Sequence, residues 1–347
     1  NWVDAATNVQ AAVDVCEPGA RVLVTDGVYR LSLPLSLTNG ILMESVSGPA
    51  ATTLDGINTG GCIYASHSSN VLDGFTLRRG WATNGGGLRM IGGTARNCII
   101  AGNTATNGGG VHLSGNAILE NCLLSGNTAQ WGGGLWLGDS GTVQNCTLAG
   151  NTALSSGGGV YGVTTSTIFN CILYSNAAPA GTNHDLSGDL TCTYNDSVPL
   201  LAGAGNLADD PLLTPSLRLK SASTCIDAGT ASGAPSTDLE DRPRCDDPRH
   251  SAGPSTVDLG ALEFTDADLD SMDDYWELAQ FGDTATSDGT GDADSDLLSD
   301  LLEYENSFYP TNPTSYGDSL NDLGKATYGF IPRHVLEPLL GGDTDQD

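Results

Sequence analysis

The chain has 347 residues, and its 46 glycines with only 6% aromatic residues are typical of many short strands joined by tight turns. The formal net charge is −29 at pH 7, which argues against binding nucleic acid because phosphate contacts need clustered Lys and Arg. No apolar run approaches the roughly 18 residues that span a bilayer, so we expect no transmembrane segment in this chain.

The first 40 residues predict an N-terminal cap followed by a first strand. Val9, Ala12 and Val13 share one helical face, and Gly19 is expected to end this helix. The apolar run from Val22 to Val24 then begins an extended segment. An atypical unit of this kind protects the open end of a repeat protein, whose strand edges and apolar surface would otherwise be exposed.

A seven-residue phrase that begins with Asn-Cys and ends with Asn recurs along the middle of the chain. Its copies begin at Asn97, Asn121, Asn145 and Asn170, so the interval between them is nearly constant. A period of about 24 residues marks a solenoid, because one repeat cannot bury its apolar face and stacked neighbours supply the core. We therefore predict an all-β solenoid whose coils, each one period long, run from residue 41 to residue 195.

The segment after each triple glycine alternates between inward and outward side chains, as strands do. The residues predicted to point inward are Leu88, Val111, Leu135 and Val160. The residues between them, predicted to stack outward in one file, are Arg89, His112, Trp136 and Tyr161. Aromatic faces beside polar groups can stack on sugar rings, so this file, with Trp131 nearby, predicts a carbohydrate-binding surface. The alternative is that these are ordinary exposed positions, since scattered surface aromatics need no function.

The repeat also predicts two files of buried side chains. Its cysteines are expected to stack as small apolar residues one strand spacing apart, and they are Cys98, Cys122, Cys146 and Cys171. Its closing asparagines are expected to bond to one another along a turn, and they are Asn103, Asn127, Asn151 and Asn176. Cys225 and Cys245 lie outside these files and are the better candidates for a disulfide.

Residues 196–264 depart from the period and are interpreted as a C-terminal capping segment rich in Pro, Gly and turns. The runs Cys225-Ile226-Asp227-Ala228-Gly229 and Asp258-Leu259-Gly260-Ala261-Leu262-Glu263-Phe264 resemble the ending of the choice-of-anchor Q group, and residues 1–14 resemble its first segment. The coils resemble the right-handed parallel β-helix repeat proteins of bacterial surfaces. This resemblance implies a right-handed parallel β-helix in an exported protein that is extracellular or bound at the cell surface, and it leaves the chemistry undecided.

Residues 265–347 are rich in acids, and two twelve-residue loops in this segment repeat one ligand spacing. Carboxylates occupy positions 1, 3, 5, 9 and 12 of the loops, namely Asp266, Asp268, Asp270, Asp274 and Glu277, then Asp292, Asp294, Asp296, Asp300 and Glu303. Ca²⁺ prefers about six to eight oxygen ligands, and position 7 adds a backbone carbonyl, from Met272 or Leu298. The spacing therefore predicts two calcium sites, and the alternative is a solvated acidic run.

The usual glycine at position 6 is replaced by Ser271 and Leu297, which predicts weaker binding or a different loop path. The loops resemble thrombospondin type 3 or dockerin-like repeats, which implies a spacer toward an anchor or, less in keeping with the unequal loops, docking to a cohesin. A degenerate third copy is expected to include Asp318 and Asp322. The last residues that resemble the start of another loop are Asp343, Asp345 and Asp347.

A polysaccharide lyase would need a base and cations that neutralise a uronate. The residues expected in such a pocket are Asp73, Arg78, Arg79, Arg89, Arg96 and His112. A hydrolase would need paired carboxylates, but Glu120, Asp139 and Asp185 do not share a repeat position. We therefore favour a protein without catalytic activity, with a secreted polysaccharide lyase as the alternative.

These patterns together predict an extracellular structural or adhesive protein of the cell surface, in which a rigid β-helix rod precedes a calcium-stabilised tail. A glycan is the expected binding partner of the outward file. The open end of a solenoid is a template for strand addition, so self-association into a filament is a further hypothesis.

Overall fold

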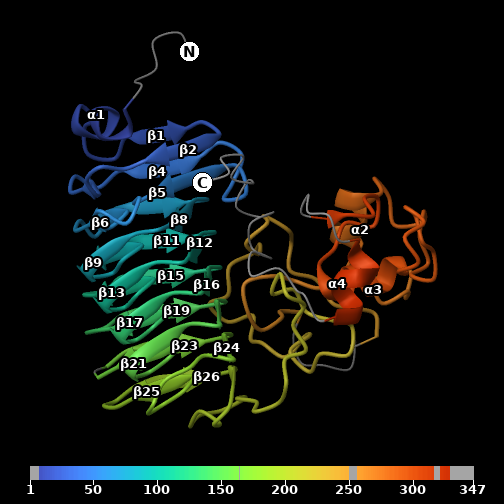
Figure 1. The fold of residues 1–347 in the computed structure, drawn as a ribbon. Helices are drawn as coiled ribbons and strands as arrows, with labels where there is room; N and C mark the ends of the chain where they lie inside the picture. The colour runs from blue at the N-terminus through green and yellow to red at the C-terminus, as the bar shows by residue number, and fades with distance from the viewer. Residues whose placement is uncertain (1–7, 164, 250–255, 316–320, 329–347) are drawn as a thin grey trace.

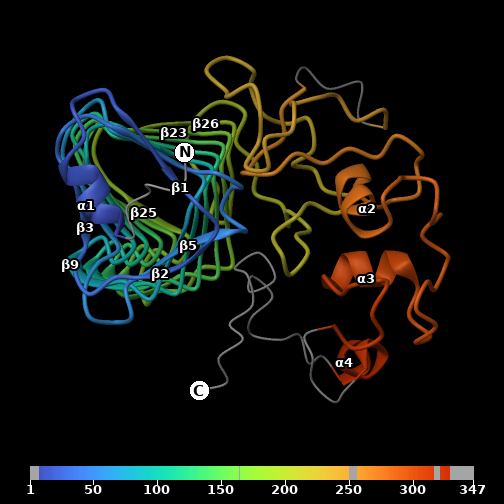
Figure 2. The same cartoon turned by 90° about the horizontal axis from the view of Figure 1, so that it is seen from above.

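A computed structural model describes residues 8–163, 165–249, 256–315 and 321–328 of the chain. Figure 1 shows a stack of flat coils, followed by a segment with little regular structure beside the stack and then by three short helices. Seen from above in Figure 2, this segment and the helices lie on one side of the stack. The described residues therefore form a β-solenoid with an attached acidic segment.

Within the described residues, the coils contribute strands to four parallel sheets, which we number in the order in which the chain meets them in one coil. Sheet 1 consists of β1 (Arg21–Val24), β4 (Leu42–Ser45), β7 (Val71–Asp73), β11 (Thr94–Arg96), β15 (Ile118–Glu120), β19 (Thr142–Gln144), β23 (Thr167–Phe169) and β26 (Thr191–Thr193). Sheet 2 consists of β2 (Gly27–Arg30), β5 (Thr52–Asp55), β8 (Thr76–Arg78), β12 (Ile99–Ala101), β16 (Leu123–Ser125), β20 (Thr147–Ala149), β24 (Ile172–Tyr174) and β27 (Asp196–Ser197). Sheet 3 consists of β9 (Trp81–Asn84), β13 (Thr104–Asn107), β17 (Thr128–Trp131) and β21 (Thr152–Ser156). Sheet 4 consists of β3 (Leu35–Leu37), β6 (Ile63–Ala65), β10 (Leu88–Ile91), β14 (Val111–Ser114), β18 (Leu135–Leu137), β22 (Val160–Gly162) and β25 (His184–Leu186).

The register of the sheets places like residues of successive coils above one another. In sheet 4, Leu88 pairs with Val111, Val111 with Leu135, and Leu135 with Val160. All four side chains are fully buried, so the predicted inward positions are confirmed. The same pairs are one predicted period apart, which confirms the predicted length of the coil.

The Asn that opens each repeated phrase forms the corner between sheet 1 and sheet 2. Its backbone is left-handed in each copy, with φ of 53°, 48°, 48° and 54° at Asn97, Asn121, Asn145 and Asn170. Asn adopts this conformation more readily than other residues that carry a side chain, because its short amide can bond to the nearby backbone. The corner therefore explains why this position repeats, which the sequence period alone left unassigned.

The N-terminal end of the stack is covered by a helix, as predicted. This helix, α1 (Val9–Asp14), buries Val9 and Val13 against the first coil. It ends at Asp14, whereas the sequence predicted an end at Gly19. Pro18 accounts for the difference, because in a continued helix its ring would clash with the carbonyl of Asp14 and it has no amide to donate there.

Both predicted files of buried side chains are confirmed. The four repeat cysteines are free thiols with no exposed surface. In the second file, Asn103 Nδ2 donates to Asn127 Oδ1 at 3.0 Å, and Asn127 Nδ2 donates to Asn151 Oδ1 at 2.9 Å. The file continues through Asn176 to Asn183, which the repeated phrase does not include. These amides give partners to backbone and side-chain groups that no water reaches.

The predicted disulfide between Cys225 and Cys245 is wrong, since both are free thiols. Cys225 is buried and donates from Sγ to Asp196 Oδ2 at 3.3 Å, whereas Cys245 is exposed. The two were paired only because both lie outside the repeat. Such an argument cannot show that two cysteines approach within the roughly 7 Å between Cα atoms that a disulfide requires.

The segment after the last coil covers the C-terminal end of the stack with its first residues and then folds back along sheet 2. Asn206 Oδ1 accepts a hydrogen bond from the Asn195 amide at 2.8 Å, which continues the buried polar file past the last coil. The described residues of 208–264, here called the flank segment, then lie beside sheet 2 (Figure 2). In this contact Leu239 and Leu262 pack on outward side chains of sheet 2 that include Leu123.

Three helices follow the flank segment, namely α2 (Asp274–Gln280), α3 (Asp300–Asn306) and α4 (Asp322–Tyr328). A second apolar core joins the first two helices to the stack, and in it Trp276 of α2 and Tyr304 of α3 pack in one cluster with Ile172 of β24. The hydroxyl of Tyr304 also donates to the carbonyl of Leu219 at 2.6 Å. The acidic segment therefore packs against the solenoid and the flank segment through α2 and α3.

Candidate functional site

Each of the two acidic loops runs directly into a helix. The first loop ends within α2 and the second within α3, so that positions 9 and 12 of both loops lie in the first turn of a helix. Asp273 and Ser299 cap the two helices by accepting a hydrogen bond from a backbone amide. The helix starts therefore fix where the carboxylates at positions 9 and 12 lie relative to the rest of each loop.

The two loops follow the same backbone path. In the first, Asp266 at position 1 accepts hydrogen bonds from the Asp270 amide at 3.1 Å and the Ser271 amide at 2.7 Å. In the second, Asp292 accepts from the Asp296 amide at 3.1 Å and the Leu297 amide at 3.0 Å. Position 1 thus closes each loop by the same pair of bonds.

Position 6 keeps the backbone conformation that glycine usually supplies. Ser271 has φ of 83° and Leu297 has φ of 80°, in the left-handed region that costs a residue with a side chain about 1–2 kcal/mol. The predicted change of loop path is therefore wrong, because the loop geometry prevails over the preference of these two residues. The predicted loss of affinity stays a prediction.

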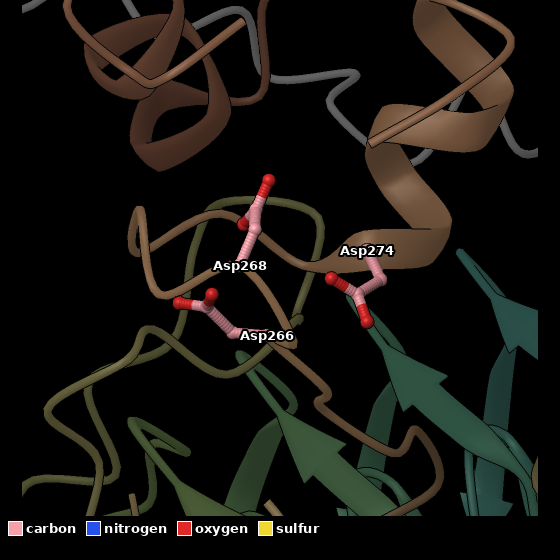
Figure 3. A group of neighbouring side chains, drawn as sticks. All are labelled: Asp266, Asp268 and Asp274. Carbon is pink, nitrogen blue, oxygen red and sulfur yellow. The ribbon is translucent and has the colours of Figure 1, made fainter. Parts of the chain in front are cut away.

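The carboxylates of the first loop converge in two overlapping groups. Asp266, Asp268 and Asp274 offer oxygen atoms within 4.8 Å of one another, and Figure 3 shows their side chains around the start of α2. Asp268 also belongs to a second group, with Asp270 and Glu277, that meets the same limit. These groups could hold a metal ion.

The second loop gathers Asp292, Asp294 and Asp296 within the same 4.8 Å limit. Asp300 at position 9 is further engaged, since its Oδ1 accepts from the Ala293 amide at 3.0 Å and its Oδ2 accepts from Ser287 Oγ at 2.6 Å. The second loop therefore brings together fewer of its predicted ligands than the first.

The glutamate at position 12 is the most informative residue of each loop. Glu277 and Glu303 are both fully buried, and neither carboxylate oxygen of either residue has a hydrogen-bond partner. Burial, and then the neighbouring aspartates, raise the pKa of Glu277 to about 8 and that of Glu303 to about 9. A buried carboxylate without a partner is costly, so the loops fit a cation that would supply the missing charge.

The remaining ligand position is backbone. Met272 and Leu298 occupy position 7, and both side chains are buried. Met272 lies in the same apolar core as Trp276 and Tyr304. In the first loop the buried side chain at position 7 therefore ties the loop to the second apolar core.

Among the described contacts, a positively charged side chain pairs with position 1 of the first loop, and none pairs with position 1 of the second loop. Arg249 Nη2 lies 2.6 Å from Asp266 Oδ2, and its guanidinium also lies over the Phe264 ring at 5.5 Å. This arginine pairs with the position 1 carboxylate of the first loop. It therefore lowers the net negative charge that the first loop presents to a cation.

The expected third and fourth copies are described only in part. Asp322 is the first residue of α4. Asp318 and the final residues Asp343, Asp345 and Asp347 lie outside the described residues.

The second candidate site is the outward file of sheet 4, and the register places its members as predicted. Arg89 pairs with His112, His112 with Trp136, and Trp136 with Tyr161. Tyr64 extends the file by one coil, and its ring lies 5.1 Å from the Arg89 guanidinium. Tyr64 falls one period before Arg89 in the sequence, so the repeat period also indicates this position as a member of the file.

Two members of the file form a flat stacked surface. The rings of His112 and Trp136 are 4.3 Å apart and inclined by only 8°. Arg89 Nε and His112 Nδ1 are buried and have no hydrogen-bond partner. Burial, and then the charge of Arg89, lower the pKa of His112 to about 4, so the imidazole is neutral at pH 7. A neutral ring that stacks on an indole offers both an apolar face and polar edges.

Trp131 does not belong to this file. It lies in β17 of sheet 3, where it pairs with Asn107 and Ser156, and it is 38% exposed. The triple glycine at 132–134 separates it from Trp136 along the chain. The two tryptophans were linked by their closeness in sequence, but a corner of the coil turns them toward different sheets.

The arginines expected to form a lyase pocket lie on three different sides of the stack, so that prediction is wrong. Arg78 and Arg79 both pair with the buried Asp55, at 3.1 Å and 2.6 Å. Arg89 lies in sheet 4, whereas Arg96 lies in sheet 1 and pairs with Asp73 at 2.8 Å. Residues 78 to 96 span most of one coil, and a coil that closes on itself turns such neighbours away from one another.

A charged file on sheet 1 was not predicted from the sequence. Glu44, Asp73, Arg96 and Glu120 pair in register and line a groove of about 740 Å³ between sheet 1 and the flank segment. Asp73, Arg96 and Glu120 follow one another at the repeat period, a signal that was missed because Glu120 was compared with acids at other repeat positions. Within the groove Arg96 donates to Asp73 at 2.8 Å, and Glu120 accepts from the neutral amide of Gln144 at 2.5 Å.

Comparison with known families supports the fold. Residues 39–196, a little under half of the chain, match the family described as the right handed beta helix region. Together with the parallel register, this match confirms the predicted right-handed parallel β-helix. No curated protein and no solved structure matches the chain. Among the helices that the structure describes, none is both long and apolar enough to cross a membrane.

Proposed function

We propose that this right-handed β-helix is an extracellular structural or adhesive protein whose acidic segment is held against the coil stack by two calcium ions. The observation that carries this proposal is the pair of fully buried glutamates, Glu277 and Glu303, with all four carboxylate oxygens unpartnered in two loops of the same geometry. A divalent cation would give these oxygens a partner and neutralise the aspartates that surround them.

The donor set favours calcium among the common metal ions. Every predicted ligand is an oxygen, and neither loop contains His or Cys, the residues that zinc prefers. Five carboxylates and one carbonyl in a flexible loop suit calcium, which takes about six to eight oxygens, whereas magnesium usually keeps several waters and binds one or two carboxylates. Calcium is therefore the ion that uses the whole loop.

Calcium would also explain how a strongly acidic segment packs against an apolar core. Met272, Trp276 and Tyr304 belong to the loops and helices, yet they lie in one cluster with Ile172 of the coil stack. Repulsion among the neighbouring carboxylates opposes this packing, and a bound cation removes it. The proposed role of calcium is thus to attach the acidic segment to the rod.

Isothermal titration of calcium into chelator-treated protein tests this proposal. We expect two ions per chain, and one ion in each of the variants Glu277→Gln and Glu303→Gln. Glu305→Gln is the matched control, because Glu305 lies in the same helix as Glu303 but is partly exposed and 3.7 Å from Lys220. Absence of calcium uptake at millimolar concentration, or an unchanged stoichiometry in both variants, would refute the proposal.

A second candidate function is binding of a glycan along sheet 4. The stacked pair His112 and Trp136 lies in register between Arg89 and Tyr161, so aromatic and cationic side chains follow one another at one coil spacing on the outward side of sheet 4. Successive coils about 4.8 Å apart repeat these groups along the rod. An extended sugar chain could therefore stack and form hydrogen bonds over several coils.

Affinity electrophoresis in gels that contain candidate polysaccharides tests this second function. We expect retardation that Trp136→Ala abolishes while calcium binding stays intact. Trp81→Ala is the control, since Trp81 is 59% exposed but lies in sheet 3. Equal retardation of the two variants would count against a site on sheet 4. Location outside the cell and assembly into filaments stay predictions, for which electron microscopy of the native material is the direct observation.

A further inference from the structure

The third helix of the acidic segment repeats the local geometry of the first two. We call a loop and the helix that follows it a unit. In each unit the first residue of the helix accepts a hydrogen bond from the backbone amide seven residues earlier. Ala267 donates to Asp274, Ala293 to Asp300 and Ser315 to Asp322, each at 3.0 Å. These three bonds link loop positions 2 and 9, so the described residues at the start of α4 form a third unit with the same helix start as the first two.

This third unit has a lysine where the first two have their buried glutamates. Lys325 is the fourth residue of α4, as Glu277 is of α2 and Glu303 of α3. Its side chain is as buried as theirs, at 1% exposure. Thr314 also replaces the aspartate that stands at position 1 of the other loops. The unit therefore has a cationic side chain at a position where its neighbours have an anion.

The contacts of Lys325 are those expected of a cation in such a loop. Nζ lies 3.0 Å from Asp322 Oδ1, the position 9 carboxylate, and it also donates to the carbonyl of Ser315. Glu277 and Glu303 leave their oxygens without partners, whereas the ammonium of Lys325 is paired with a carboxylate and a backbone oxygen. The positive charge in this unit is thus part of the polypeptide.

We propose that the Lys325 ammonium takes the place of the metal ion at the start of α4, so that this helix folds without calcium and helps to position the second loop. The contact with the second loop is the hydrogen bond from the Leu323 amide to Asp296 Oδ2 at 3.2 Å. Asp296 is the position 5 ligand of that loop, and this bond orients its carboxylate. Only the effect on the second loop rests on the proposed calcium sites.

Hydrogen exchange of the whole chain in chelator tests the first part of this inference. The amides of α4 are expected to be protected without calcium. Lys325→Met keeps the length of the side chain but removes its charge, and it is expected to speed their exchange roughly a hundredfold or more by leaving Asp322 buried without its cationic partner. The double variant Lys325→Met/Asp322→Asn removes both charges and is expected to recover much of the protection. Exchange in the coil strands serves as the control for folding.

Two results would overturn the inference. One is α4 that is unprotected in chelator and becomes protected only with calcium, and the other is α4 that exchanges equally in the parent protein and in Lys325→Met. These readouts stand even if the chain binds no calcium. Where calcium does bind, Lys325→Met is expected to weaken the second site severalfold and leave the first unchanged, and equal weakening of both would exclude the positioning role.

Discussion

Replacement of Glu303 by Gln is expected to have opposite effects with and without calcium. Glu303 is fully buried, and both its carboxylate oxygens lack partners. With calcium bound, the carboxylate is a ligand and the substitution removes it. Without calcium, burial and then Asp294 and Asp296 keep Glu303 protonated up to about pH 9, so folding at pH 8 must take up a proton, and the neutral amide avoids this cost.

The magnitude follows from the pKa. Burial, and then Asp294, raise the pKa of Glu303 from 4.5 to about 9. Because the folded pKa is raised, the metal-free fold is most stable below pH 4.5 and loses stability as the pH rises toward 9. At pH 8 this loss is about 5 kcal/mol at roughly 1.4 kcal/mol per unit, whereas a buried amide without partners costs about 1–3 kcal/mol. The variant should therefore gain about 2–4 kcal/mol in chelator at pH 8.

With calcium the sign reverses. An ion at about ten thousand times its dissociation constant contributes about 5.5 kcal/mol to the parent protein, which exceeds the gain of about 2–4 kcal/mol in chelator, and the variant loses this contribution. Hydrogen exchange of the α3 amides, corrected for intrinsic rates, measures the local free energy of opening in both conditions. A variant that is destabilised by the same amount in chelator and in calcium would refute the reasoning, because Glu303 would then be a structural side chain and not a ligand.

Three further predictions concern other parts of the molecule. Arg249→Gln should raise the calcium affinity of the first loop about twofold to fivefold, because it removes a cation 2.6 Å from Asp266. In a calcium titration the affinity of the second loop should not change, and an unchanged affinity of the first loop would contradict this prediction. Asn127→Ala should lower the free energy of unfolding in urea by about 2–4 kcal/mol, because the buried backbone amide of Asn103 loses its acceptor and the Ile100 carbonyl loses a donor. The same substitution at the less buried Asn107 should cost far less. Cys98, Cys122 and Cys146 should resist a maleimide until urea unfolds the coils, because burial raises the pKa of each thiol and excludes the reagent; labelling of Cys146 in the native protein would show that the file is open.

Much of the solenoid could be predicted because its contacts recur at a constant offset. Once residues one period apart are stacked, the neighbours of each position follow without further information, and so Val111, His112 and Asn127 were placed on the correct face. The acidic loops were predictable for a related reason. Their ligand positions lie within twelve consecutive residues, so local spacing determines which carboxylates converge.

Consecutive apolar residues in the repeated phrase indicate strands that are buried on both faces, which the alternation of inward and outward side chains does not predict. Ile99 and Ile100 are adjacent and both buried, as are Leu123 and Leu124. A strand with apolar residues on both faces must be covered on both faces. The phrase therefore indicated that something packs outside sheet 2, although it did not indicate which part of the chain does so.

The amino-acid sequence by itself determined the coil, its inward and outward faces, and the ligand spacing of the acidic loops, because each depends on neighbours at a short or repeating separation. Only the tertiary structure decided that the flank segment returns to sheet 2, where the Thr237 carbonyl accepts from Asn121 at 2.8 Å although the two are far apart in the chain. It also decided that Lys325 occupies the place of Glu277 and Glu303. Such contacts join segments with no common period, so their partners are selected by complementary surfaces that exist only once the coils have stacked.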